Sequence, residues 1–172
     1  MAVFCKNPAI SILLFINSGC KKKNISDQKT SYSFFVAGHT YGTPGTEEIG
    51  LYSEFKNKFP LINSYPAMKL GILTGDIVKS PSTESWNAVD QDIETLGIPA
   101  FFAVGNHDMY DRDLFEDRYG ETYFDTIINN DLFIILDPNL DHWNISGEQL
   151  NFLEESIITN ATNINNIFVF FP

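Results

Sequence analysis

The chain has 172 residues, which is long enough for one domain with a sizeable hydrophobic core. Hydrophobic residues make up 44% of it and aromatic residues 14%, a composition typical of a globular protein and not of a disordered one. The formal net charge of −11 disfavours a long nucleic acid as the partner, because binding a phosphate backbone needs clustered Lys and Arg. A small phosphorylated substrate stays open, since a bound metal ion can supply positive charge locally.

The first twenty residues have the pattern of an export signal. Lys6 supplies a positive flank before the apolar stretch over residues 9–16. That stretch is shorter than the roughly 20 residues of a membrane span and suits the core of a signal peptide. The small residues Ser18 and Gly19 precede Cys20, as in the cleavage site of bacterial lipoproteins, although Asn17 departs from that pattern.

We therefore expect a signal peptide over residues 1–19 and a polar tether over residues 20–30. The mature protein would lie in the bacterial periplasm or outer membrane, held at the membrane by a lipid on Cys20. The alternative is an ordinary buried strand or helix at the N-terminus. Both cysteines, Cys5 and Cys20, lie in this segment, so the body of the chain has no cysteine for a disulfide or a zinc-thiolate site.

From Ser31 onward, apolar runs alternate with helical patterns. Apolar runs predict five strands, over residues 31–37, 70–74, 100–104, 132–137 and 166–171. Because apolar residues follow one another almost without interruption inside these runs, we expect strands that are covered on both faces.

Helical spacing predicts four helices between these strands. Leu51, Phe55 and Phe59 lie four residues apart and predict a helix over residues 47–59. The 3-4-3 spacing that begins at Trp86 predicts a second helix, which Gly97 and Pro99 end. The third is a short helix over residues 111–118, and the fourth follows a capping box of Ser146 and Gln149. The alternation predicts an α/β fold in which at least part of the sheet is parallel.

Three of the predicted strands end in the same way, with an apolar run, a glycine and a polar residue. They are "FFVAGH", "GILTGD" and "FFAVGNHD". Each glycine lets the backbone turn tightly. Parallel strands leave their carboxyl ends at one edge of the sheet, where ligands bind. We therefore expect His39, Asp76, Asn106 and His107 to converge.

The chemistry of these side chains points to a metal site. An imidazole, a carboxylate and an amide oxygen form a mixed set that suits Mn, Fe or Zn. Asp76 has two oxygens and could bridge two ions roughly 3.5–4 Å apart, a pair that activates water and clamps a phosphoryl group. His107 could protonate the leaving oxygen, and Asp108 could orient His107 through its ring N–H.

The motifs "GDIV" and "GNHD", about thirty residues apart and each after an apolar strand, resemble those of the calcineurin-like metallophosphoesterases. "AGHTYG" stands where that family has an Asp-x-His motif, and "FIILDPN" and "WNISGEQLNFLEESI" are similar to its continuation. The resemblance covers residues 31–172. It implies a β-sandwich flanked by helices, with βαβαβ units in its N-terminal portion, and hydrolysis of phosphoesters with two divalent metal ions.

Carried over residue by residue, the resemblance implies that His39 ligates the first metal and Asp76 bridges both. It implies that Asn106 ligates the second metal and that His107 is the catalytic histidine. Ala37 stands where the family has an aspartate, and the family's later histidines, including a Gly-His-x-His motif, are not found in the chain. We therefore expect an incomplete domain, and it stays open whether two ions bind or fewer.

Two alternatives remain beside a two-metal phosphoesterase. One is a catalytically inactive binding or scaffold lipoprotein that keeps the fold without the metals. The other is a hydrolase with a single metal. The glycine-rich "GHTYGTPG" lacks the Lys-Ser/Thr ending of a phosphate loop, and His142 and Trp143 are assigned to a loop without a role. The substrate class beyond a small phosphorylated molecule stays open.

Overall fold

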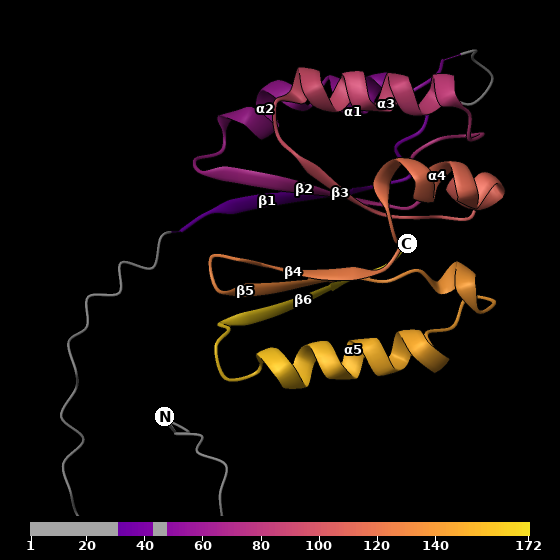
Figure 1. Ribbon diagram of the computed structural model, residues 1–172. Helices are drawn as coiled ribbons and strands as arrows, with labels where there is room; N and C mark the ends of the chain where they lie inside the picture. The colour runs from indigo at the N-terminus through magenta and orange to yellow at the C-terminus, as the bar shows by residue number, and fades with distance from the viewer. Residues whose placement is uncertain (1–30, 43–47) are drawn as a thin grey trace, which may run out of the picture.

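The computed structural model describes residues 31–42 and 48–172. Figure 1 shows two sheets that lie one above the other, with helices on both outer sides. The predicted signal peptide and tether lie outside the described residues. Among the helices of the described ranges, none is both long and apolar enough to cross a membrane.

The first sheet is parallel, with strand order β1-β2-β3. Its strands are β1 (Ser33–Gly38), β2 (Met68–Thr74) and β3 (Ala100–Ala103). Helices α1 (Ser53–Lys56) and α2 (Phe59–Ser64) connect the first two strands, and α3 (Thr83–Leu96) connects the second to the third. The predicted βαβαβ arrangement is confirmed.

The single helix predicted over residues 47–59 is wrong. Leu51 lies before α1, where it forms an isolated bridge with Tyr41. Pro60 lies in the first turn of α2. A proline is tolerated there but cannot continue a helix from before it, because its ring meets the carbonyl four residues earlier. The helical pattern is therefore divided between α1 and α2.

The helix predicted around Trp86 is confirmed as α3, and it ends at Gly97 as predicted. Ser82 caps it, and the side chain of Ser85 bonds back to the Ser82 backbone in a capping box. Gly97 ends it in a left-handed conformation (φ 73°). Trp86 and Val89 are buried on its inner face.

The second sheet is mixed, with strand order β4-β5-β6. Strands β4 (Phe124–Ile128) and β5 (Asp131–Ile135) are antiparallel, and β6 (Asn166–Phe170) is parallel to β5. Strand β4 was not predicted. It joins β5 through Asn129 and Asn130, which both have positive φ, as a two-residue hairpin turn requires.

Four helical segments lie along the chain between β3 and β6. They are η1 (Asp108–Asp111) with α4 (Arg112–Tyr119), the short η2 (Pro138–Leu140), and α5 (Gly147–Asn160). The helix predicted over residues 111–118 is therefore confirmed. The capping box predicted at the start of α5 is wrong: the Ser146 hydroxyl donates to the Asp141 carboxylate, and the Gln149 side chain bonds to the backbone of Asp137.

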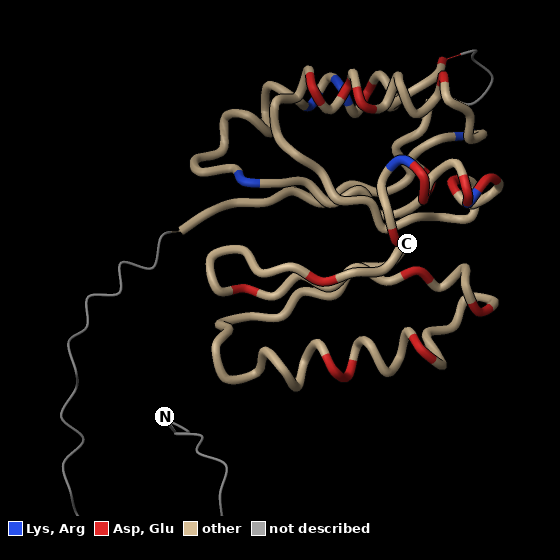
Figure 2. The backbone as a smooth tube through the Cα atoms, viewed as in Figure 1, with Lys and Arg blue, Asp and Glu red and all other residues tan. Residues whose placement is uncertain are grey.

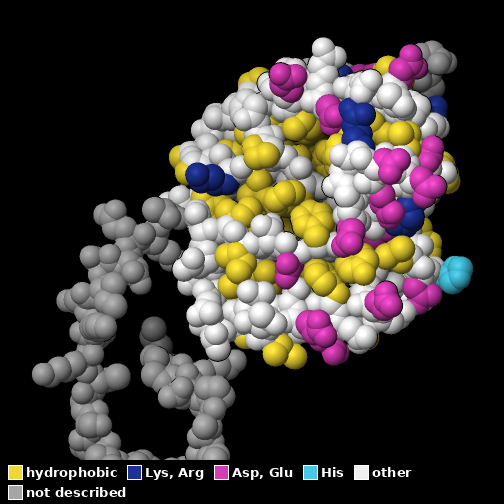
Figure 3. All heavy atoms as spheres, in the orientation of Figure 1, with side chains coloured by type: hydrophobic (Ala, Val, Ile, Leu, Met, Phe, Trp, Pro, Cys, Tyr) yellow, Lys and Arg dark blue, Asp and Glu magenta, His cyan; other side chains and the backbone are white. Residues whose placement is uncertain are grey.

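The core has three apolar layers. The first lies between the upper sheet and its helices, the second between the two sheets, and the third between the lower sheet and α5. Strands β2 and β5 contribute to two layers each, which is why each has apolar residues on both of its faces. Figure 3 shows hydrophobic side chains that also reach the surface, with acidic side chains beside them.

Candidate functional site

The structure brings the three glycine-ended strand motifs together at one edge of the parallel sheet. His39 follows β1, Asp76 follows β2 and Asn106 follows β3, and all three line a cavity of about 200 Å³. Its other lining residues are Thr74, Gly75, Gly105, Trp143 and Pro172. Three side chains that are far apart in the sequence thus face one small space.

Backbone hydrogen bonds continue past the ends of the strands and fix this edge. The His39 N–H donates to the Gly75 carbonyl (2.9 Å), and the Tyr41 N–H donates to the Asp76 carbonyl (3.1 Å). His39 and Asp76 both adopt left-handed backbone conformations (φ 54° and 53°). Such a conformation costs about 1–3 kcal/mol for a residue with a side chain and is concentrated at functional sites.

The Asp76 carboxylate lies between the first and third motifs. Its Oδ2 is 3.1 Å from the His39 Nδ1, and its Oδ1 accepts a long hydrogen bond (3.4 Å) from the His107 N–H. The His39 side chain is 65% exposed and that of Asp76 is 20% exposed. An open imidazole in contact with a partly sheltered carboxylate can offer both groups to one cation.

His107 is oriented by a backbone carbonyl. Its Nδ1 lies 2.9 Å from the Lys79 oxygen, which only accepts, so Nδ1 carries the hydrogen and Nε2 is left as the second ring nitrogen. The Tyr41 ring lies between the two histidines, 4.5 Å from the His39 ring and 5.2 Å from the His107 ring. Tyr41 was not predicted to lie at the site, although it stands only two residues after His39.

Asp108 acts on the backbone of the site. Its Oδ1 accepts from the N–H groups of Ile77 (2.8 Å) and Val78 (2.9 Å), and its Oδ2 accepts from that of Gly105 (2.9 Å). The predicted contact of Asp108 with the His107 ring is not found among the described hydrogen bonds. The reason is that the Asp108 side chain is fully buried and turns toward the loop after β2.

Burial raises the pKa of Asp108 to about 6. The three backbone hydrogen bonds lower the pKa, and the nearby charge of Asp76 raises it further. Desolvation is the largest of these effects, as expected for a carboxyl group away from water. Through its hydrogen bonds to Ile77, Val78 and Gly105, Asp108 ties the loop that carries Asp76 to the loop that carries Asn106.

Gly105 is required by the close approach of these loops. A Cβ at this position would lie 2.5 Å from both the Oδ1 and the backbone nitrogen of Asp76, which is shorter than any normal contact. The glycine of the "GNHD" motif is thus needed for packing, because the absence of a side chain lets the Asp76 carboxylate lie against the end of β3.

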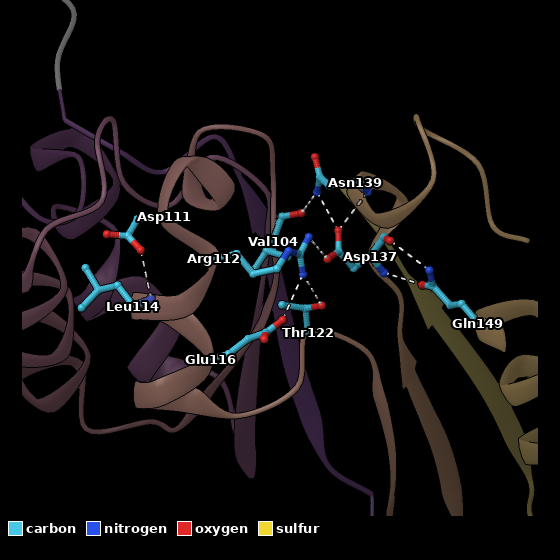
Figure 4. Close-up of polar contacts among 9 residues, drawn as sticks. All are labelled: Val104, Asp111, Arg112, Leu114, Glu116, Thr122, Asp137, Asn139 and Gln149. Atoms are coloured by element: carbon cyan, nitrogen blue, oxygen red, sulfur yellow. Dashed lines mark hydrogen bonds and ion pairs between the residues drawn. The ribbon is translucent and has the colours of Figure 1, made fainter. Parts of the chain in front are cut away.

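A buried polar cluster holds the same edge from below. Figure 4 shows Asp137, which follows β5, between Arg112, Asn139 and Gln149. Asp137 is fully buried; its Oδ2 accepts from Arg112 (2.8 Å), and its Oδ1 accepts from the Asn139 amide (2.7 Å). The Asn139 amide also donates to the Val104 carbonyl (2.9 Å), immediately before Gly105. The lower sheet is thereby joined to the loop that carries Asn106 and His107.

The donors at this edge fit one divalent cation better than two. They are one imidazole, one carboxylate and one amide, so water would have to fill the remaining positions of a single ion. Within the described residues, no group of three His, Cys, Asp or Glu side chains is close enough to hold a metal. Ala37 is half-buried and packs against the apolar layer under the helices. Its methyl group cannot bind a metal ion.

The chain as a whole carries an excess of negative charge. The whole chain has 22 Asp and Glu against 11 Lys and Arg, and Figure 2 shows the acidic residues distributed over both halves of the molecule. A phosphorylated ligand would therefore meet repulsion at this edge without a cation to offset it. No protein-family model and no curated protein matches this chain.

Proposed function

We propose that this protein hydrolyses a phosphoester with the help of a divalent metal ion held by His39, Asp76 and Asn106. The observation that carries the proposal is the cavity that these three side chains line together, with His107 beside them. The resemblance of "GDIV" and "GNHD" to the calcineurin-like metallophosphoesterases supports it. So does the presence of two sheets with helices outside them, which suits that family's sandwich.

When bound, the metal would activate water and draw the phosphoryl group into the cavity. The chain's own residues have separate tasks in this account. Asp76 and His39 hold the cation, while the Lys79 carbonyl keeps the His107 ring in one tautomer. In its doubly protonated form, His107 would donate the Nε2 proton to the leaving oxygen and return to the neutral tautomer that keeps its hydrogen on Nδ1. Asp108 and Gly105 hold the two loops at the separation that the cavity needs.

We further propose that the protein is exported in a bacterium and anchored by a lipid on Cys20. An inactive binding or scaffold lipoprotein is the second candidate. It is favoured by Ala37, which leaves the first metal position with one carboxylate fewer than the family uses.

The test is phosphate release from an aryl phosphate by the 172-residue chain, with Mn²⁺, Fe²⁺ or Zn²⁺ in turn. The proposal expects metal-dependent release that Asp76→Asn abolishes. Neither metal binding nor release would favour the scaffold candidate, and equal release by wild type and Asp76→Asn would contradict the proposal.

A further inference from the structure

We propose that Trp143 forms a stacking surface at the mouth of the cavity, and that the substrate is a phosphate ester of a planar aromatic group or a nucleoside. This inference rests on the proposed function, because it assigns the substrate class of the same site. From the sequence, Trp143 was predicted to be a loop residue without a role.

Trp143 lies at the site. It lines the cavity together with His39, Asp76 and Asn106, although it comes from the loop between β5 and α5 on the lower sheet. As a whole residue, Trp143 is 59% exposed. The indole therefore has one part at the cavity and a large part open to solvent, where a ligand can cover it.

The backbone holds Trp143 in this position at a cost. Both His142 and Trp143 have positive φ (48° and 70°), a conformation that is unusual for residues with large side chains. The turn is closed by a bridge between Asp141 and Asn144, and the Trp143 N–H donates to the Pro138 carbonyl (2.9 Å). Strain of this kind persists only where the surrounding structure over-determines it.

Hydrogen bonds tie the surroundings of this turn to the rest of the fold. Asn139, one residue after Pro138, is held by Asp137 and by the carbonyl of Val104, and Asp137 is itself held by Gln149 (Figure 4). The loop that presents Trp143 is thus fixed to the strand end that presents Asn106. Such pre-organisation reduces the entropy lost when a ligand binds.

The composition of the cavity wall agrees with a substrate in two parts. The cavity of about 200 Å³ is lined by polar side chains that suit a phosphoryl group and by the indole of Trp143. A phosphoryl group bound by the polar side chains therefore brings the group attached to it close to the indole. A planar group gains from that position by stacking, whereas a sugar or an alkyl chain gains little.

The chain supplies its own spectroscopic probe. It has two tryptophans, and Trp86 is fully buried in the layer under the helices. Quenching of tryptophan fluorescence by a ligand at the site should therefore come from Trp143. Adenosine tests the stacking surface without phosphate or metal. Adenosine monophosphate, phenyl phosphate and ribose 5-phosphate, each with Zn²⁺, test the whole site by fluorescence and by calorimetry.

For the wild-type chain we expect adenosine monophosphate to bind about tenfold more tightly than ribose 5-phosphate, with quenching by the planar ligands only. Trp143→Leu should abolish the preference and the quenching, and Trp143→Phe should keep most of the preference. Tyr65→Leu is the matched control, because Tyr65 is 56% exposed but lines a different hollow. Phenyl phosphate binding as tightly as adenosine monophosphate would identify a simple aryl ester, and weaker binding a nucleoside ester.

The inference is overturned if adenosine monophosphate and ribose 5-phosphate bind the wild type equally, or if Trp143→Leu keeps the preference. Failure of the proposed function looks different. In that case Zn²⁺ has no effect on affinity and no phosphate is released, while adenosine still quenches Trp143.

Discussion

The Nδ1 atom of His39 lies 3.1 Å from the Oδ2 atom of Asp76, although 37 residues separate them in the sequence. The register of the parallel pair β1 and β2 produces this contact, because Gly38 lies opposite Thr74 at the last pair of the ladder. The two side chains that follow must then leave the sheet at the same edge. A slip of one residue would turn every side chain of one strand to the other face, so the contact depends on the packing of both strands.

Asp108 makes the stability of the protein depend on pH. Its pKa is about 6 in the folded protein, above the ordinary value of 3.8. Between these values the folded state binds more protons than the unfolded chain, so the contribution of Asp108 to the free energy of unfolding falls as pH rises from about 4 to about 6. The expected fall is about 3 kcal/mol at most. Above pH 6 Asp108 adds no further dependence.

Denaturant unfolding of wild type and Asp108→Asn at a series of pH values measures this effect. The asparagine does not titrate, so the variant should lack this part of the slope. It should also be less stable by about 1–3 kcal/mol at pH 7, because its NH₂ faces one of the backbone donors that Asp108 satisfies. The exposed Asp117 gives a control, Asp117→Asn, which should keep the wild-type slope. Parallel curves for wild type and Asp108→Asn would contradict the assignment.

Local patterns predicted most of the fold. The strands around Ile72, Phe102 and Ile134 and the helix around Trp86 were found because burial imposes apolar periodicity on each segment independently. Strand β4 was not predicted, although "FDTII" is rich in aromatic and β-branched residues and a two-asparagine turn follows it.

The site could be predicted in part. The glycine-ended strands indicated that His39, Asp76 and Asn106 would share one edge, because parallel topology fixes where strand ends lie. The partners of Asp108 could not be predicted, since they are backbone N–H groups that carry no sequence signal. The position of Trp143 could not be predicted either, because it depends on how the two sheets pack.

The ion pair between Arg112 and Asp137 should be essential for stability. Asp137→Ala leaves the partly buried Arg112 without its shortest contact and removes the acceptor for Asn139, so we expect a loss of about 3–5 kcal/mol. Glu116→Ala removes the exposed partner of the same arginine and should cost less than about 1 kcal/mol. Urea unfolding at pH 7 compares the two variants. Equal losses in the free energy of unfolding would show that the buried ion pair with Asp137 stabilises the protein no more than the exposed pair with Glu116.

His107→Ala should lower turnover of an aryl phosphate by about 10²–10⁴-fold and leave metal affinity nearly unchanged, because His107 is assigned as an acid and not as a ligand. Lys79→Ala is the matched control. It keeps the backbone carbonyl that orients the His107 ring and should retain turnover. Metal loss equal to the loss of turnover in His107→Ala would instead identify His107 as a ligand.

Cys20 should carry the proposed lipid anchor. In a bacterial host the wild-type protein should incorporate labelled fatty acid and sediment with membranes, and Cys20→Ala should do neither. Cys5→Ala should behave as wild type, since Cys5 lies inside the expected signal peptide. An unlabelled, soluble wild type would remove the anchor from this account.

The central claim is that His39, Asp76 and Asn106 hold one divalent metal ion. Calorimetric titration of Zn²⁺ and Mn²⁺ into the 172-residue chain tests it most directly, with Asp76→Asn, Asn106→Ala and the exposed control Asp117→Asn beside the wild type. We expect one ion per chain for wild type and for Asp117→Asn. Affinity for the metal should fall by more than about 100-fold in Asp76→Asn. Removing a metal ligand costs more affinity than removing a residue that only forms a hydrogen bond to a ligand. Unchanged affinity in Asp76→Asn, or the absence of metal binding in the wild type, would contradict the claim.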